Sequence, residues 1–251
     1  MAEILVRRRV PLFCFPCAGG SARAYEPWRT SVPEPLEVRP VELAGRGHRI
    51  RERPLTRLTD VVDDLAGRVR TELAATPGEY VLFGHSLGAV LAYECARVLT
   101  TEGHRPAALV VAAHRAPHLP LRERRIQHLP DDRFLAGIRA LARTPGEVFD
   151  SPEPLRVLMP ALRADFAVSE GYEPLPGELL RCPVLAFGGT EDPTVALREL
   201  WAWRDHTTAG FAVRLVPGGH FFPVEHGFGF PELLVGKLVP MLAPDSVRRA
   251  G

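Results

Sequence analysis

Two kinds of segment are missing from this 251-residue sequence: a long apolar run and a block of like charges. No stretch is long and apolar enough to cross a bilayer, which argues against a membrane-spanning helix. The formal net charge is only +1, whereas chains that bind nucleic acid normally carry a strong basic excess. Near the start, Arg7, Arg8 and Arg9 follow an apolar triplet, which reverses the order of a secretory signal peptide. These absences predict a cytoplasmic protein with neither a membrane nor a nucleic acid as partner.

Cysteine is also scarce, with four residues in the chain: Cys14, Cys17, Cys95 and Cys182. They are scattered through segments with strand or helix patterns, as is typical of buried thiols in a reducing compartment. Cys14 and Cys17 form a C-x-x-C pair, a spacing that also occurs in redox and zinc sites. No second C-x-x-C or histidine pair completes a metal site, so we expect no bound metal.

The composition, with 46% hydrophobic and 24% charged residues, is typical of an enzyme with a substantial core, and one domain suffices for this length. Apolar runs of strand length alternate with segments of helical periodicity. The predicted strands are 11–15, 37–43, 80–84, 107–113, 183–187 and 211–216, and predicted helices include 58–73, 90–101, 195–203 and 231–242. This alternation predicts an α/β fold with a mostly parallel sheet flanked by helices.

The strongest functional pattern lies at residues 80–90, where an apolar strand runs through Gly84-His85-Ser86-Leu87-Gly88 into a helix. Gly-x-Ser-x-Gly between a strand and a helix is the nucleophile elbow of α/β-hydrolases, in which the serine stands on a sharp, strained turn. The glycines are needed because larger side chains would collide with that turn. A serine nucleophile also requires a histidine base, an acid that orients it, and donors for an oxyanion.

Two later strands end in loops that carry such side chains. The loop after 183–187 contains Glu191 and Asp192, and hydrolases place the acid between serine and histidine in chain order. We assign the acid to Asp192, with Glu191 as the close competitor and a helix cap as the non-catalytic alternative. The loop after 211–216 brings His220, which we assign as the base of Ser86, with His226 as its rival.

The other seven histidines receive no catalytic role. His85 lies inside the elbow and is expected to point along the turn, while His114 follows a predicted strand and lines a hinge. The remaining five are expected at the surface: His48, His104, His118, His128 and His206.

A glycine-rich loop, 16–21, follows the first predicted strand. In the α/β-hydrolase layout such a loop supplies one backbone N–H of the oxyanion hole, and the residue after the nucleophile supplies the other. We assign these roles to Ala18 and Leu87, with Cys17 as the near alternative to Ala18. The non-functional alternative is a plain turn.

Residues 114–177 break the alternation of strands and helices. Nine prolines separate short helical patterns at 131–143 and 155–169, and no strong strand pattern occurs among them. We interpret 114–177 as a helical lid insertion over Ser86, with 1–113 and 178–251 forming one hydrolase core. Its arginine cluster, Arg122, Arg124 and Arg125, is most simply a solvated surface, and the alternative is docking of an acidic partner.

Several segments together resemble the type II thioesterases of polyketide and nonribosomal peptide biosynthesis, members of the α/β-hydrolase superfamily. They are 15–21 (FPCAGGS), 84–88 (GHSLG), 129–135 (LPDDRFL), 162–166 (LRADF), 189–193 (GTEDP) and 218–222 (GGHFF). The resemblance covers nearly the whole chain, and 129–135 and 162–166 make it specific because they lie in the predicted lid. The sequence departs from the family at Leu87, where methionine is common, and at Cys17, where histidine or an aromatic residue is usual.

The resemblance implies an editing enzyme that hydrolyses aberrant or stalled acyl groups from the phosphopantetheine thioester of acyl or peptidyl carrier proteins, through an acyl-serine intermediate. It implies no metal and no cofactor beyond the phosphopantetheine of the substrate. We also expect a monomer. Because carrier proteins are generally acidic, the resemblance also makes Arg122, Arg124 and Arg125 a candidate docking patch. The alternatives are a general carboxylesterase or acyltransferase of the same fold, and a non-catalytic module that binds carrier proteins.

Overall fold

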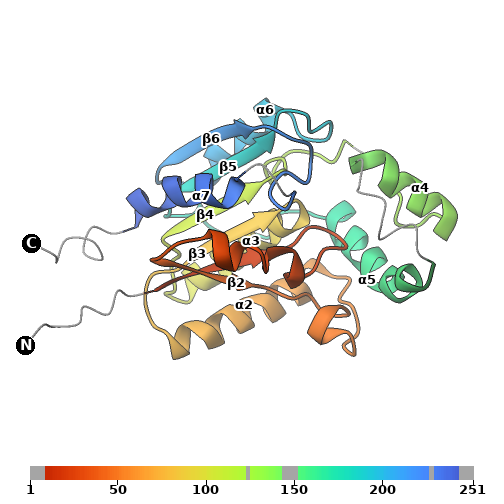
Figure 1. Cartoon of the computed structure of the whole chain (residues 1–251), viewed down its shortest axis with the longest axis horizontal. Helices are drawn as coiled ribbons and strands as arrows, with labels where there is room; N and C mark the ends of the chain where they lie inside the picture. Colours follow the sequence, from red (N-terminus) through yellow and green to blue (C-terminus); the bar gives the residue numbers. More distant parts are fainter. Residues whose placement is uncertain (1–8, 123–124, 143–151, 226–228, 243–251) are drawn as a thin grey trace, which may run out of the picture.

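A six-stranded sheet runs through the middle of the molecule in the order β2-β1-β3-β4-β5-β6 (Figure 1). The computed structural model describes residues 9–122, 125–142, 152–225 and 229–242. The strands are β1 (Val10–Phe15), β2 (Leu36–Pro40), β3 (Val81–His85), β4 (Ala108–Ala112), β5 (Val184–Gly189) and β6 (Phe211–Val216). All five neighbouring pairs are parallel. This confirms the predicted α/β fold with a parallel sheet, although β2 ends three residues before the predicted boundary.

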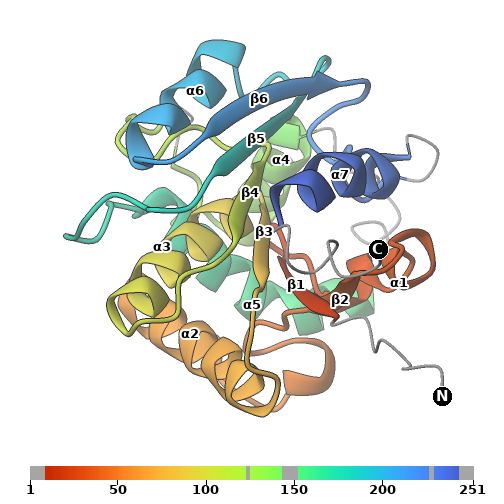
Figure 2. The same cartoon turned by 90° about the vertical axis from the view of Figure 1, so that its left-hand side faces the viewer.

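Helices cover both faces of the sheet (Figure 2). One face carries α2 (Leu58–Ala75), α3 (Leu87–Thr101), α6 (Leu197–Trp201) and η4 (Ala202–His206), and the other carries η1 (Ala22–Tyr25), α1 (Trp28–Ser31), α7 (Phe230–Leu238) and η5 (Val239–Met241). Successive strand residues point to opposite faces, so Leu82 packs with α2 and α3, whereas Val81 and Phe83 pack with α1 and α7. The sheet therefore separates two hydrophobic cores.

Between β4 and β5 the chain forms two longer helices, α4 (Asp131–Ala142) and α5 (Pro152–Glu170), at about the places predicted. They lie beyond the carboxyl ends of the strands (Figure 1). We refer to the described residues of 114–177 as the α4–α5 segment. It has a small buried cluster of its own, made by Ile126, Phe134, Ile138 and Leu162. None of the helices in the described ranges combines the length and the apolar character that a bilayer crossing requires.

The short helices η1 and α1, within residues 22–31, were not predicted. Tyr25 and Trp28 from these helices are buried, with ring centroids 5.2 Å apart, and both rings lie against Phe83. Each helix spans a single turn, which is too short for the apolar spacing of an amphipathic helix to be visible in the sequence.

Candidate active site

Ser86 lies at the turn between β3 and α3. Its backbone has φ 54° and ψ −119°, a strained conformation for a residue with a side chain. Its N–H donates to the carbonyl of Ala112 on β4 at 2.8 Å, which fixes the turn to the neighbouring strand. A Cβ at Gly84 would lie 2.1 Å from the carbonyl oxygen of Gly88, and one at Gly88 would lie 2.2 Å from that of Phe15. Both glycines are therefore required by the close approach of α3 to the sheet.

The structure brings together the three side chains selected from the sequence. His220 Nε2 lies 2.9 Å from Ser86 Oγ, and His220 Nδ1 lies 2.9 Å from Asp192 Oδ2. Asp192 comes from the loop after β5 and His220 from the loop after β6, and parallel strands end at the same edge of a sheet. The two loops are also joined by a hydrogen bond of 2.9 Å from Glu191 N–H to the Gly218 carbonyl.

Asp192 is held as a carboxylate. Its side chain is fully buried, and its Oδ1 accepts hydrogen bonds from the backbone N–H and the hydroxyl of Thr194 at 2.8 and 2.7 Å. Burial alone would raise the pKa of the Asp192 carboxyl, but hydrogen bonds from His220 and Thr194 outweigh it and lower the pKa below its ordinary value. Asp192 is therefore charged at neutral pH and able to orient the Nδ1–H of His220.

His85 has a position that sequence reasoning missed. It is fully buried, and burial together with the neighbouring His220 lowers its pKa to about 3, so the ring is neutral. Its Nε2 therefore carries the hydrogen and donates to the backbone carbonyl of His220 at 2.7 Å. His85 thus anchors the backbone of the residue that contacts Ser86, and its place inside the elbow motif was the available signal.

The glycine-rich loop forms a turn in which Gly20 N–H donates to the Cys17 carbonyl at 2.9 Å. Gly19 N–H is also engaged, by the Asp165 carboxylate at 2.7 Å. No hydrogen bond among the described residues uses the N–H of Ala18 or of Leu87, which is the first residue of α3 and lacks an intrahelical partner. The turn can therefore offer an oxyanion only the amides of Cys17 and Ala18.

The competing assignments fare differently. The Glu191 side chain is exposed, unlike that of Asp192, and His226 lies outside the described residues. His48, His104, His118 and His128 are exposed, as expected. The surface assignment of His206 was wrong: this residue is buried, and its ring nitrogens contact the Tyr93 hydroxyl at 3.0 Å and His118 Nδ1 at 2.8 Å.

The cysteines occur as four free thiols. Burial, reinforced by the nearby Asp165 carboxylate, raises the pKa of the Cys17 thiol to about 12, so it is not a thiolate at neutral pH. In the ranges that the structure describes, no group of three or more His, Cys, Asp and Glu side chains is arranged to hold a metal ion.

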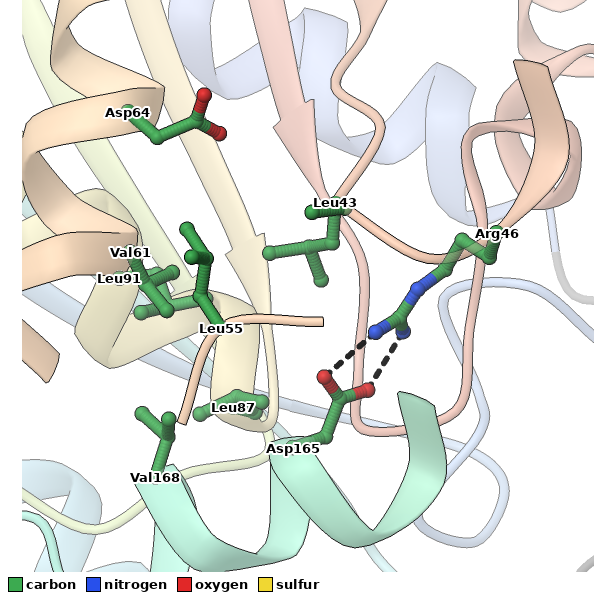
Figure 3. Close-up of a pocket in the computed structure, with 10 residues that line it drawn as sticks. Leu43, Arg46, Leu55, Val61, Asp64, Leu87, Leu91, Asp165 and Val168 are labelled. Atoms are coloured by element: carbon green, nitrogen blue, oxygen red, sulfur yellow. Dashed lines mark hydrogen bonds and ion pairs between the residues drawn. The ribbon is translucent and has the colours of Figure 1, made fainter. Parts of the chain in front are cut away.

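A narrow cavity lies beside Leu87, between α5 and the body of the fold (Figure 3). Its walls are mainly apolar and include Leu43, Leu55, Leu87, Leu91 and Val168. Arg46 and Asp165 close one side of it, joined by two hydrogen bonds (Figure 3). The cavity has room for about one water molecule, so a larger group can enter only if α5 or the surrounding side chains move.

A parallel sheet, a serine on a strand–turn–helix elbow, and a histidine and carboxylate from the last two strand ends are the features of a serine hydrolase of the α/β-hydrolase type. The family model described as the Thioesterase domain matches residues 10–235. The chain therefore belongs to the Thioesterase domain family.

Three similar proteins narrow the relationship. The gramicidin S biosynthesis protein GrsT of Aneurinibacillus migulanus is 36% identical, over 97% of this chain and 94% of that protein. The structure of ClbQ from the colibactin NRPS/PKS pathway is 32% identical with a TM-score of 0.87, covering 93% of this chain and 98% of that one. The type II thioesterase BorB from the borrelidin biosynthetic cluster is 34% identical with a TM-score of 0.82, covering 96% and 95%. These similarities confirm the resemblance to type II thioesterases.

Proposed function

We propose that this chain is an editing thioesterase that hydrolyses aberrant or stalled acyl groups from the phosphopantetheine arm of acyl or peptidyl carrier proteins. The observation that carries the proposal is the continuous chain of hydrogen bonds from Ser86 through His220 to Asp192, beside the free amide of Leu87. The similar proteins support the proposal too, because they come from polyketide and nonribosomal peptide biosynthesis.

The first half-reaction transfers the acyl group to the enzyme. His220 Nε2 removes the proton of Ser86 while Ser86 Oγ attacks the thioester carbonyl carbon. The amides of Leu87 and of Ala18 or Cys17 donate to the oxyanion that forms. The carbon–sulfur bond then breaks, and the protonated His220 returns its proton to the sulfur. A thiol with a pKa of about 8.5 is a far better leaving group than an alcohol or an amine.

The second half-reaction releases the free acid. His220 removes a proton from a water molecule, which attacks the carbonyl of acyl-Ser86, and the same oxyanion donors act again. When the intermediate collapses, His220 protonates the departing Ser86 oxygen. Asp192 keeps the Nδ1–H of His220 in place throughout and stabilises the imidazolium that each half-reaction forms. Every step uses these side chains and water, and the only prosthetic group is the phosphopantetheine that the substrate carries.

Residues 114–177 act in this proposal as a lid on a core formed by 1–113 and 178–251. The support is the position of α5: a Cβ at Gly19 would lie 2.7 Å from Leu162, and Val168 lines the cavity beside Leu87. The acyl chain would enter this cavity when α5 shifts.

Docking of an acidic carrier protein on the lid arginines has weaker support. Arg122 forms an ion pair of 2.9 Å with Glu199 on α6, and a carrier protein would have to compete with it. Arg125 is exposed, and Arg124 lies outside the described residues.

The test is intact-protein mass spectrometry of carrier proteins loaded with a panel of acyl groups, before and after addition of the enzyme. We expect the mass of the acyl group to be lost with wild type and retained with Ser86→Ala. An acyl-pantetheine and a nitrophenyl ester, assayed in parallel, separate a thioesterase from a general carboxylesterase. Faster turnover of the oxygen ester, or failure to label Ser86 with a fluorophosphonate probe, would contradict the proposal.

A further inference from the structure

The oxyanion loop, residues 17–20, is held by the carboxylate of Asp165. Figure 3 shows this side chain on α5, paired with Arg46. Asp165 Oδ2 accepts hydrogen bonds from Gly19 N–H at 2.7 Å and from Arg46 Nη1 at 2.5 Å, and its Oδ1 accepts from Arg46 Nη2 at 2.6 Å. Arg46 Nη1 also donates to the carbonyl of Gly20 at 3.0 Å. Two successive residues of the loop are therefore held: Asp165 binds Gly19 through its N–H, and Arg46 binds Gly20 through its carbonyl.

The bond from Gly20 N–H to the Cys17 carbonyl orients the peptide that carries the Ala18 N–H, and the bond from Gly19 N–H to Asp165 orients the peptide that follows it. Gly19 has φ 73°, and Gly20 N–H closes the turn on the Cys17 carbonyl, which is the arrangement of a type II turn. In such a turn the central peptide, between Ala18 and Gly19, flips readily unless something holds it. The bond from Gly19 N–H to Asp165 fixes the orientation of that peptide.

The energetics favour a geometric role for the ion pair. The side chains of Arg46 and Asp165 are only 2% and 6% exposed. The cost of removing two such charges from water is about as large as their attraction, so a buried pair is weak evidence for a gain in stability. What the pair does provide is a bidentate geometry that fixes α5, the loop that carries Arg46 and the oxyanion loop relative to one another.

We propose that Asp165 and Arg46 are positioning residues for the oxyanion hole, an inference that rests on the proposed function. Neither side chain touches the reacting atoms. Asp165 acts through Gly19, and Arg46 acts through Asp165 and Gly20. As a result, the oxyanion loop is in its reactive conformation only while α5 is docked on it.

The test compares Asp165→Asn with Glu170→Gln. Glu170 is the matched control because it is a buried carboxylate on the same helix that also accepts backbone hydrogen bonds, but from Ile126 and Gln127 within the α4–α5 segment. For Asp165→Asn we expect kcat to fall about 10- to 100-fold with KM changed less than about twofold, since the loop acts on the transition state. For Glu170→Gln we expect kcat within about threefold of wild type when the protein is folded.

A second measurement separates positioning from a loss of structure. A trifluoromethyl ketone analogue of the substrate forms a tetrahedral adduct with Ser86 that bears an oxyanion, whereas a thioether analogue resembles the ground state. We expect Asp165→Asn to lower the affinity for the ketone analogue by the same factor as it lowers kcat/KM. The affinity for the thioether analogue should stay unchanged. Equal losses for both analogues, or equal losses of kcat in Asp165→Asn and Glu170→Gln, would overturn the inference.

Asp165→Asn leaves Arg46 with an incomplete partner and can impair folding. The double variant Arg46→Met with Asp165→Leu replaces the pair by apolar groups of similar volume, which folded proteins tolerate. It should fold and still show the loss of kcat, because the acceptor for Gly19 N–H is gone; wild-type kcat in this variant would contradict the inference. Turnover that survives Ser86→Ala would overturn the proposed function, whereas turnover lost in Ser86→Ala but normal in Asp165→Asn would overturn only this inference.

Discussion

The two sides of the active site are supported in different ways. On the sheet side, backbone hydrogen bonds attach the residues to strands: Ser86 N–H donates to Ala112, and the loops of Asp192 and His220 are joined through Glu191 and Gly218. On the helix side, the oxyanion loop is held by the side chains of Asp165 and Arg46. Ser86 and His220 therefore share the stability of the sheet, whereas the loop 17–20, the proposed oxyanion loop, also depends on the docking of α5.

The sheet also has larger hydrophobic cores than the α4–α5 segment. The sheet is buried between two large clusters of apolar side chains, whereas the described residues of 114–177 have a separate cluster of four buried side chains. A region with few buried apolar contacts opens at a lower free energy than the whole protein. The α4–α5 segment is therefore expected to move while the sheet and the serine elbow stay folded.

The largest effect that we predict is a loss of hydrolysis on substitution of Ser86, which lies on the sheet side. Ser86→Ala removes the proposed nucleophile, so the rate of thioester hydrolysis should fall by about 10⁴-fold or more. Urea unfolding should remain close to wild type, since the alanine keeps the same strained backbone. Ser86→Gly is the companion variant: it should be equally inactive but more stable than Ser86→Ala, by about 1 kcal/mol, because glycine tolerates φ 54°.

The second prediction concerns the carboxylate behind His220. Asp192→Asn should lower kcat by about 10³- to 10⁴-fold, because an amide cannot stabilise the imidazolium and favours the wrong tautomer of the ring. This loss should exceed that of Asp165→Asn, since Asp192 contacts the proposed base His220 directly, whereas Asp165 only positions the proposed oxyanion loop. Single-turnover assays with an acyl-pantetheine measure both variants; a larger loss in Asp165→Asn would reverse our comparison of the two sides.

The third prediction tests the cores. Phe83 and Phe134 are both fully buried, but Phe83 packs on the sheet and Phe134 packs between α4 and α5. All three tryptophans, Trp28, Trp201 and Trp203, lie outside the α4–α5 segment, so their fluorescence follows unfolding of the sheet region. Phe83→Ala should lower the free energy of unfolding measured in this way by about 3–5 kcal/mol.

Phe134→Ala should lower the free energy of unfolding reported by tryptophan fluorescence by about 1 kcal/mol or less. The substitution mainly makes local opening of the α4–α5 segment easier, and the tryptophans do not report that opening. Hydrogen exchange should then accelerate in α4 and α5 but not in β3 or α3. Equal shifts in the tryptophan transition for the two variants would mean that both regions unfold as one unit.

The smallest predicted effect concerns the junction of the two regions, where His206 of the core contacts His118 of the α4–α5 segment. Burial and the neighbouring His118 lower the pKa of His206 to about 4, whereas an unfolded histidine has a pKa of about 6.5. Between these values the unfolded state binds more protons, so acid destabilises the protein. The slope of the unfolding free energy against pH reports how many more protons the unfolded state binds than the folded state. Between pH 6.5 and 5, His206→Gln should lower this number by up to about one.

This slope is measured by urea unfolding at several pH values. Burial also lowers the pKa of His85 and of His114, each to about 3, so these residues add to the same dependence. An unchanged slope in His206→Gln would show that His206 titrates in the folded protein as it does in the unfolded chain.

The sequence was sufficient for features set by local pattern and chain order. Strand runs and helical periodicity predicted the parallel sheet, and the elbow motif with two later strand ends selected Ser86, Asp192 and His220, which the structure places in contact. These selections work because the carboxyl ends of parallel strands meet at one edge, wherever they occur along the chain.

The contacts that sequence reasoning missed join distant residues, each of which has a simpler local interpretation. Arg46 lies among turn-forming glycines and Asp165 on an amphipathic helix, so neither pattern shows that they meet across 119 positions. His206 follows an arginine and an aspartate, which suggests a surface, but η4 turns it inward against Tyr93. Such side-chain contacts depend on how the elements pack, which the periodicity of one segment does not contain.

The bidentate pairing of Arg46 with Asp165 has an evolutionary consequence. A mutation of either residue alone leaves a charge without its partner inside the protein, where an unpaired charge costs far more than a missing pair. Substitutions at the two positions are therefore expected to arise together, so that related sequences carry both charges or neither. A collection of homologous sequences in which one position varies freely while the other stays fixed would show that natural selection does not act on the pair.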